Sequence, residues 1–109
     1  MILRIWHGYT SKANASTYEK LLKTEVIPAI EQKQIAGYRK FQLLRRELDK
    51  ETEFTTIMWF DQIESVIDFV GEDYESVYVP EKAKAVLSRY DTRAAHSELI
   101  VTFDIHPKA

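Results

Sequence analysis

Three histidines carry the side chains that titrate closest to neutral pH in this 109-residue sequence, and two of them lie in apolar, strand-like segments. His7 lies near the end of the first such segment, and His96 lies near the start of the last one, two residues before Glu98. If those two strands pair antiparallel, the three side chains gather on one face of a sheet. A histidine in that cluster could act as the base that removes a phenolic proton, leaving an anion able to give an electron to molecular oxygen.

The same cluster has two other interpretations. Two histidines and a carboxylate are a ligand set for a transition metal, although no metal site is predicted here. The groups could also hydrogen-bond across the strands, or to Arg4 or Arg93, in a structural role that is common for such residues. The third histidine, His106, lies in the C-terminal tail, where we expect it to be solvated.

Aromatic residues make up 12% of the chain and could line a pocket for a planar molecule. Tyr74 and Tyr78 lie in an irregular segment that we expect to border such a pocket, where their hydroxyls could bind the polar edge of a substrate. Packing in the core is the alternative for both tyrosines, because buried aromatic rings dominate core energetics.

Charge and composition exclude several other functions. The chain has 15 Lys and Arg against 17 Asp and Glu, a net charge of -2, whereas nucleic-acid binders normally carry a basic excess. Residues 37–41 are a poor match to the aromatic strand of RNA-recognition domains, so no nucleic-acid partner is expected. Cysteine is absent, which excludes disulfides and thiolate metal sites.

The length of the chain predicts a single domain over residues 1–109. Its N-terminal apolar stretch is too short and too interrupted for a signal peptide or a membrane span, so we expect a cytoplasmic protein with no membrane partner. Three glycines and three prolines leave little loop. Any chemistry must therefore come from side chains on strands and helices.

Hydrophobic periodicity and capping residues predict the first elements. A strand over 2–9 precedes a helix that should open near Asn14 or Ser16, and Ser16 with Glu19 could form a capping box. Pro28 lies inside the apolar stripe of this helix. Because proline cannot donate to the carbonyl of Thr24, the helix should kink or restart there.

The middle of the chain predicts a hairpin and a second helix. The hairpin pairs residues 38–47 with residues 53–60 across a polar turn. Asp61 and Glu64 are suited to cap the start of the helix that follows, and Gly71 is suited to end it.

The C-terminal part predicts a short helix and a closing strand. Pro80 starts the helix, whose apolar stripe ends at Tyr90, and residues 93–103 form the strand. The resulting order β-α-β-β-α-β, with the short extra helix before the last strand, is typical of a ferredoxin-like α+β fold with one antiparallel sheet.

Both faces of the predicted sheet carry apolar residues. In the third strand, Phe54 and Met58 share one face, whereas Ile57 and Trp59 share the other. The predicted helices are about enough to cover one face, and large apolar patches are rare on monomers. A homodimer in which two sheets face each other is therefore expected, since two-fold dimers are the commonest symmetric assemblies.

Several segments together resemble the antibiotic-biosynthesis-monooxygenase-type family of the dimeric α+β barrel superfamily. The resemblance covers nearly the whole chain, and it is carried by the order and spacing of segments 2–8, 59–66, 69–74, 79–83, 87–91 and 96–99. It implies a homodimer in which each subunit holds a small-molecule pocket between its sheet and its helices.

The resemblance also implies site residues. In the members that form quinones, an Asn and a Trp on the third strand bind the phenol, and the matching positions here are Thr56 and Phe60. In the members that degrade heme, an Asn, a Trp and a His form the site. His7 and Phe69 stand where that Asn and Trp would be, and the segment around Tyr78 offers no matching histidine.

The sequence therefore predicts a cofactor-independent monooxygenase that oxidises a small quinol- or anthrone-like aromatic molecule with O2. His96 and His7 are the predicted catalytic residues, and Thr56, Phe60, Tyr74 and Tyr78 are the predicted substrate-binding residues. No cofactor is expected. The alternative is a non-catalytic dimeric module of the same fold that binds small molecules or serves in stress response.

Overall fold

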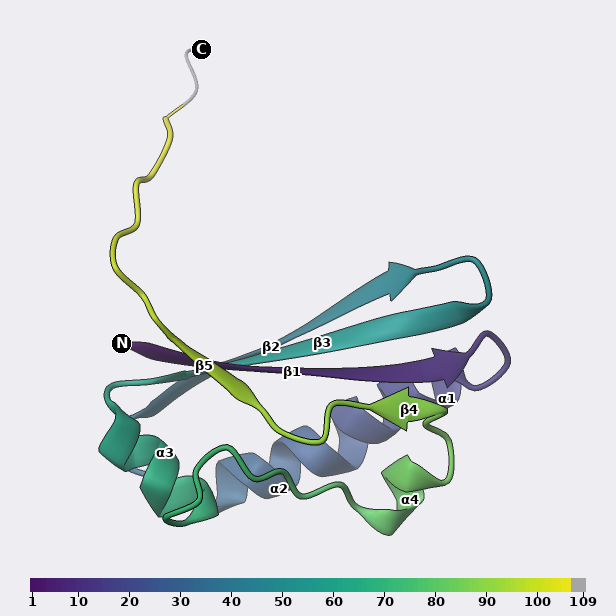
Figure 1. Cartoon of the computed structure of the whole chain (residues 1–109), viewed down its shortest axis with the longest axis horizontal. Coiled ribbons are helices and arrows are strands. Elements are labelled where there is room, and N and C mark those ends of the chain that lie inside the picture. The colour runs from purple at the N-terminus through teal and green to yellow at the C-terminus, as the bar shows by residue number, and fades with distance from the viewer. Residues whose placement is uncertain (107–109) are drawn as a thin grey trace.

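An antiparallel sheet forms the centre of the computed structural model, which describes residues 1–106 (Figure 1). The strands lie in the order β2-β3-β1-β4, and β5 also pairs with β1. Their bounds are β1 (Ile2–Ser11), β2 (Tyr38–Glu47), β3 (Glu51–Phe60), β4 (Arg89–Tyr90) and β5 (Ala95–Glu98). The expected ferredoxin-like α+β fold is thus confirmed.

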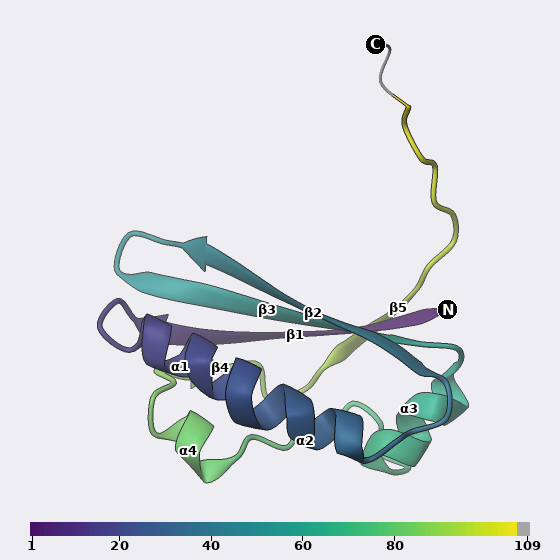
Figure 2. The same cartoon turned by 180° about the vertical axis from the view of Figure 1, so that it is seen from behind.

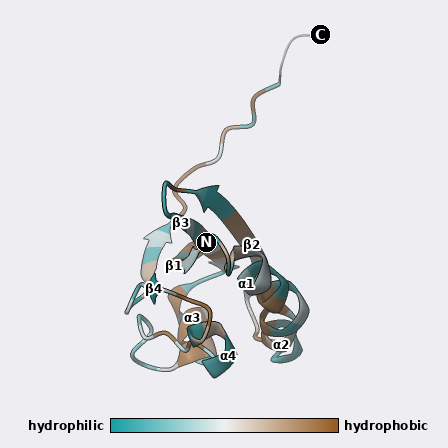
Figure 3. Ribbon diagram, turned by 90° about the vertical axis from the view of Figure 1, so that its right-hand side faces the viewer, coloured by the Kyte–Doolittle hydropathy of each residue, from teal (hydrophilic) through white to brown (hydrophobic). Residues whose placement is uncertain are grey.

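The helices all lie on one side of the sheet, as the views from behind and along the strands show (Figures 2 and 3). They are α1 (Ala15–Leu21), the π-helical turn η1 (Leu22–Val26), α2 (Ile27–Gln32), α3 (Ile63–Val70) and α4 (Glu81–Lys84). No helix covers the opposite side of the sheet within the described part of the chain, and we call that side the open face.

Strict alternation along β3 separates the two faces. Its even-numbered residues are buried beneath the helices, namely Thr52, Phe54, Thr56, Met58 and Phe60. Its odd-numbered residues are only half-buried and lie on the open face. This is the period of two that a strand imposes, because successive side chains point to opposite faces.

The first helix begins at Ala15, which confirms the earlier of the two predicted starts. Asn14 is the N-cap, and no side chain caps the helix, so the predicted box of Ser16 and Glu19 is wrong. The Glu19 carboxylate instead pairs with Lys23 at 3.0 Å and with Arg45 at 3.1 Å. Two cations compete more strongly for this carboxylate than a backbone amide does.

The predicted break near Pro28 is confirmed, and it takes the form of a π-helical turn. The backbone N–H of Ile27 donates to the carbonyl of Leu22, five residues back. The extra residue in this turn precedes the proline, so α2 restarts with Pro28 in its first turn, where no N–H is needed.

The hairpin and the helix after it differ from prediction by a residue or two. β3 begins at Glu51, because the N–H of Leu48 donates to Glu51 across a shorter turn. The N-cap of α3 is Gln62, and Asp61 instead binds the guanidinium of Arg39 at 2.6 and 2.8 Å. Gly71 ends α3 with φ of 99°, as predicted.

The predicted strand over 93–103 is wrong at both ends. The chain pairs with β1 in two short pieces, β4 and β5, and Tyr90 belongs to β4 rather than to the last helix. Beyond Leu99, whose N–H donates to the carbonyl of Met1, the segment 100–106 leaves the body of the protein (Figure 1). Its large apolar side chains are exposed: Ile100, Val101, Phe103 and Ile105.

Candidate functional site

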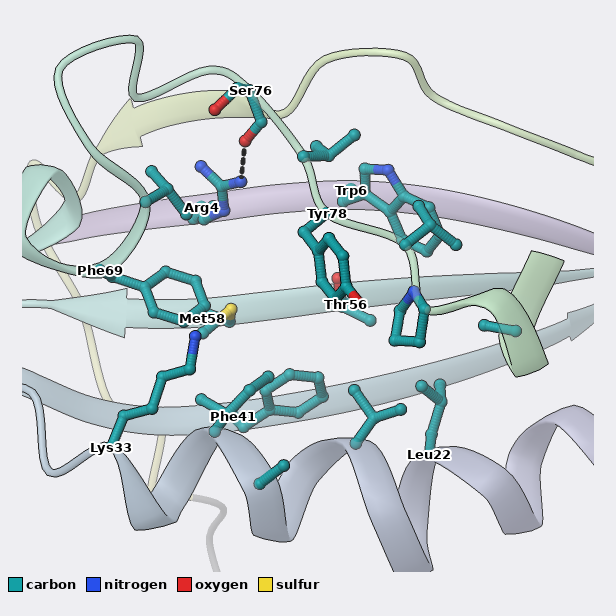
Figure 4. A pocket seen from close by; sticks show the side chains of 18 of the residues that line it. Arg4, Trp6, Leu22, Lys33, Phe41, Thr56, Met58, Phe69, Ser76 and Tyr78 are labelled. Carbon is teal, nitrogen blue, oxygen red and sulfur yellow. Dashed lines mark hydrogen bonds between the residues drawn. The ribbon is translucent and has the colours of Figure 1, made fainter.

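A cavity of about 390 Å³ lies between the helix-covered face of the sheet and the helices (Figure 4). Its walls are mostly apolar and come from β1, β2, β3, the helices and the segment 76–80. The lining includes Trp6, Tyr18, Phe41, Met58, Phe69 and Tyr78 as large side chains. This size and lining are typical of a small-molecule site.

Arg4 is the buried polar group at one end of the cavity. Its side chain projects from β1 toward the helices, and only 6% of the residue is exposed. The Nη1 group donates to the carbonyl of Tyr74 at 2.6 Å. The Nη2 group donates to the carbonyl of Ser76, also at 2.6 Å (Figure 4). These two bonds fasten the segment 72–79 over the sheet and fix the direction of the guanidinium.

No carboxylate pairs with Arg4 among the described residues. The other five arginines are exposed, and each forms at least one ion pair with an Asp or Glu. Burial lowers the pKa of Arg4 from its usual value to about 10. At neutral pH the cavity therefore holds a desolvated cation without a counter-charge.

Trp6 lies next to Arg4 on the same face of β1, and its ring crosses over Gly8. A Cβ atom on Gly8 would stand 2.8 Å from that ring, so only glycine leaves room for it. The indole Nε1–H donates to the carbonyl of Asp91 at 2.9 Å. The space above Gly8 and this hydrogen bond together fix the Trp6 ring beside the cavity.

Four residues with hydroxyl groups, Tyr18, Thr56, Ser76 and Tyr78, and the ammonium group of Lys33 supply the remaining polarity of the lining. Thr56 lies on the sheet with 9% exposed, and Tyr18 is almost fully buried in the helix layer, where burial raises its pKa above the usual range. Tyr78 is 85% exposed and borders the mouth. Lys33 lies with its Nζ 5.1 Å from the centre of the Phe69 ring.

His96 lies behind Arg4 and does not line the cavity. Its Nε2 is 3.1 Å from Arg4 Nη1, and because a guanidinium only donates, Nε2 accepts and the proton is on Nδ1. That Nδ1 is buried with no partner among the described residues. Burial, and then the charge of Arg4, lower the pKa of His96, so the ring is neutral at pH 7.

His7 lies on the open face, so the predicted cluster with His96 and Glu98 is wrong. In β1 the even-numbered Arg4 faces the helices and pairs with His96, whereas the odd-numbered His7 points the other way. Its Nδ1 is 2.8 Å from the carboxylate of Asp91. Glu98 is exposed and pairs with Ile2.

Two of the four predicted substrate-binding residues line the cavity, namely Thr56 and Tyr78. Phe60 is fully buried in the core beside Phe69, with ring centres 5.9 Å apart. Tyr74 contributes its carbonyl to Arg4 while its ring packs edge-on against His96. The catalytic and binding roles assigned from the sequence remain predictions for all of these residues.

Sequence reasoning missed Arg4 as the central polar group. Residues 2–6 read Ile-Leu-Arg-Ile-Trp, so a single cation stands in an apolar strand, at the same parity as Trp6. That parity was the available signal, because a tryptophan facing the helices places its i−2 neighbour there as well. Lys33 carried no such signal, since its position depends on where the helix ends.

Residues 1–106 contain neither a metal-binding cluster nor a helix that could span a membrane. No group of three His, Asp or Glu side chains there is arranged to hold a metal ion. In the same part of the chain, no helix has both the length and the apolar character needed to cross a membrane.

Comparison with solved structures identifies the class of fold. A Bacillus cereus protein provisionally described as an antibiotic biosynthesis monooxygenase is similar with a TM-score of 0.66 and 9% identity, over 95% of this chain and 97% of that one. An arginine-to-serine mutant of MhuD with two manganese protoporphyrin IX bound per active site is similar with a TM-score of 0.67 and 14% identity, over 95% of this chain and 99% of that one.

A third similar structure is MhuD, a heme-degrader from Mycobacterium tuberculosis with two hemes in its active site, at a TM-score of 0.59 and 15% identity, over 95% of this chain and 100% of that one. The chain thus has the fold of the antibiotic biosynthesis monooxygenase proteins. No family model matches its sequence, and no curated protein matches it.

Proposed function

We propose that this chain is a homodimeric monooxygenase that oxidises a small quinol- or anthrone-like aromatic molecule with O2 and without a bound cofactor. The observation that supports it most is the apolar cavity with one buried guanidinium, that of Arg4, which has no carboxylate partner among the described residues. A cation beside a phenol or enol lowers the pKa of that acid and favours its anion. The anion is the form of the substrate that can pass an electron to oxygen.

The reaction needs no external reductant. For an anthrone-like substrate, the methylene carbon loses two hydrogens and gains one oxygen atom as a carbonyl, and the second oxygen atom leaves as water with those two hydrogens. The substrate supplies all four electrons that reduce O2. The chain contributes by excluding water with its aromatic walls and by holding the substrate anion against Arg4.

A heme site is the other possibility that the similar structures raise, since two of them contain heme or a manganese protoporphyrin. An axial histidine is a common ligand for heme iron. Here His96 accepts from Arg4 and has its other nitrogen buried, and His7 lies on the opposite face of the sheet. The side chains of this cavity do not fit a histidine-ligated heme.

The non-catalytic alternative is favoured by one observation. Neither of the predicted catalytic histidines is among the residues that line the cavity. Without a side-chain base, the substrate proton must leave to solvent through the mouth beside Tyr78, and a cavity of this kind can also serve binding alone. Oxygen consumption decides between the two.

Oxygen uptake is measured with anthrones, quinols and flavonols on the full chain. We expect one O2 consumed per substrate molecule, a lower rate in Arg4→Met, and an unchanged rate in Arg39→Met, whose arginine is exposed and paired with Asp61. A rate that is unchanged in His96→Ala removes the role of His96 as a base. No uptake with any of these substrates supports the binding module instead.

The proposed homodimer would cover the open face of the sheet. Apolar side chains on that face include Leu3, Ile5, Ile57 and Trp59, and Leu44 is 47% exposed. The segment 100–106, which follows β5 and leaves the body of the protein, carries further exposed apolar side chains. Large exposed apolar areas of this kind mark interaction surfaces.

Size-exclusion chromatography with light scattering tests the dimer. We expect a mass of twice 12.8 kDa for the full chain, and dissociation toward 12.8 kDa in Trp59→Glu and, to a smaller extent, in Phe103→Asp. Glu81→Lys, at an exposed position in α4 on the other side of the molecule, is the control that keeps the dimer. A monomeric full chain refutes it.

A further inference from the structure

Arg4 leaves part of its hydrogen-bonding capacity unused. A guanidinium has five N–H groups, and three of them are directed at the Tyr74 carbonyl, the Ser76 carbonyl and His96. No partner for Nε–H, or for the second N–H of Nη2, is found among residues 1–106. Burying such a charge without a counter-charge is costly.

We propose that the cavity binds a monoanionic ligand, whose planar oxyanion, a carboxylate or a phenolate, pairs with Arg4 while its apolar body fills the rest of the cavity. This inference rests on the proposed function and names the charge of its substrate. The planar fork of a guanidinium matches a planar oxyanion, since two N–H groups can reach one or both oxygens. The ligand supplies the counter-charge that the described residues lack.

The charge of the lining supports an anion over a neutral molecule. The whole chain has a net charge of -2, but the 19 residues that line the cavity include no Asp or Glu. Their two charged members are Arg4 and Lys33, and neither forms an ion pair among the described residues. An anionic group entering this cavity therefore meets no repulsion from its walls.

The two cations lie at the same end of the cavity (Figure 4). Arg4 Cζ is 5.9 Å and Lys33 Nζ is 5.1 Å from the centre of the same Phe69 ring. Lys33 is exposed at the rim and can reach an anion that Arg4 binds from inside. The remaining lining, which includes Leu22 and Val26, is mostly apolar and suits the hydrocarbon part of the ligand.

A matched pair of probes tests this on the unaltered chain. 2-Naphthoate and 2-naphthamide have nearly the same size and shape, but only the naphthoate is an anion at pH 7. Calorimetric titration should show naphthoate binding about tenfold or more tightly than naphthamide, the ratio expected for one charge-assisted pair. Equal affinities, or no binding of naphthoate, overturn the proposal.

Variants test whether Arg4 causes the preference for naphthoate over naphthamide. Arg4→Met should reduce the naphthoate preference to near unity, Lys33→Met should reduce it by a smaller factor, and Arg39→Met should leave it unchanged. Arg4→Lys keeps the charge but loses the planar fork, and should retain part of the preference. Circular dichroism checks that each variant is folded, and a preference that survives in folded Arg4→Met contradicts the assignment.

The carboxylate and the phenolate are distinguished by a second probe. 2-Naphthol is neutral at pH 7 in water, so tight binding accompanied by proton release, measured in buffers of different ionisation enthalpy, would indicate that Arg4 binds it as the phenolate. Weak binding without proton release would restrict the site to carboxylates. Naphthoate binding without any oxygen uptake would refute the proposed oxygenase and support the anion site. Oxygen uptake without a preference for naphthoate would support the oxygenase and refute the anion site.

Discussion

On the helix-covered face of the sheet, Arg4 is 6% exposed and has no carboxylate partner among the described residues, whereas on the open face Arg89 is exposed and pairs with Glu51 at 2.9 Å. The two histidines also differ in whether a carboxylate binds them. His96, behind the cavity, accepts from Arg4, and His7, on the open face, is bound to a carboxylate of its own chain.

This difference indicates that the functional site lies on the helix-covered face of the sheet. Charges on the open face, such as that of Arg89, are neutralised by a carboxylate of the same face, and exposed ion pairs of this kind stabilise little. The charge under the helices is desolvated and lacks a counter-ion, which is an arrangement found at functional sites more than in structural cores. Arg4 and His7, both in β1, therefore lie in different environments on opposite faces of the sheet.

The largest expected effect compares two neighbours in β3. Phe60→Ala removes a fully buried ring that packs against Tyr38 and Phe69, so it should lower the free energy of unfolding by about 3–5 kcal/mol. Trp59→Ala, on the open face, should cost about 1 kcal/mol or less in the monomer. Urea denaturation at low protein concentration measures both.

Equal costs for these two variants would contradict the assignment of the two faces. If the destabilisation caused by Trp59→Ala grows with protein concentration, the open face is buried by a second copy of the chain.

A smaller effect concerns pH and the buried histidine. The pKa of His96 is lowered below its usual 6.5, first by burial and then by Arg4. Below pH 6.5 the unfolded chain therefore binds more protons at this site than the folded chain does, so stability should fall as the pH falls, by at most about 1.4 kcal/mol per pH unit.

His96→Gln, which can still accept from Arg4 but does not titrate, should lose that part of the pH dependence. Chemical denaturation of both proteins between pH 5 and 7 measures the difference. Parallel pH profiles for the two proteins would show that burial and the charge of Arg4 do not lower the pKa of His96.

The smallest expected effect is on the open face. Arg89→Ala removes an exposed ion pair with Glu51 and a contact with the Tyr9 ring, whose centre lies 3.7 Å from the guanidinium carbon. It should lower the melting temperature only slightly, and less still at high salt, because exposed pairs are screened. Calorimetry at two salt concentrations measures this. A large, salt-independent loss would show that the pair is buried in an assembly.

Much of the fold could be predicted because local signals agree with it. Alternation in β3, Pro28 in the long helix and Gly71 after α3 each act within a few residues, and the structure confirms all three. Start positions were less predictable. Ser16 and Asp61 have the chemistry of caps, but distant partners decided what binds near them, as the ion pair of Asp61 with Arg39 shows.

The candidate site was predictable only in part, since its residues come from segments far apart in the chain. Thr56 and Tyr78 were identified and do line the cavity. The pairing of His7 with His96 failed because the last strand is split, so that β5 places His96 opposite Arg4 while Asp91, after β4, reaches His7. Register is set by long-range contacts, and a shift of one residue moves a side chain to the other face.

The order of strands and helices, the absence of cysteine chemistry and the supply of aromatic residues follow from composition and local periodicity, so the sequence alone predicts them. The burial of Arg4 beneath the helices, with no counter-charge among residues 1–106, follows only from the way distant segments pack. Desolvation of a charge is a property of what packs around it, and here the segment 72–79 and α3, distant in sequence, supply that packing.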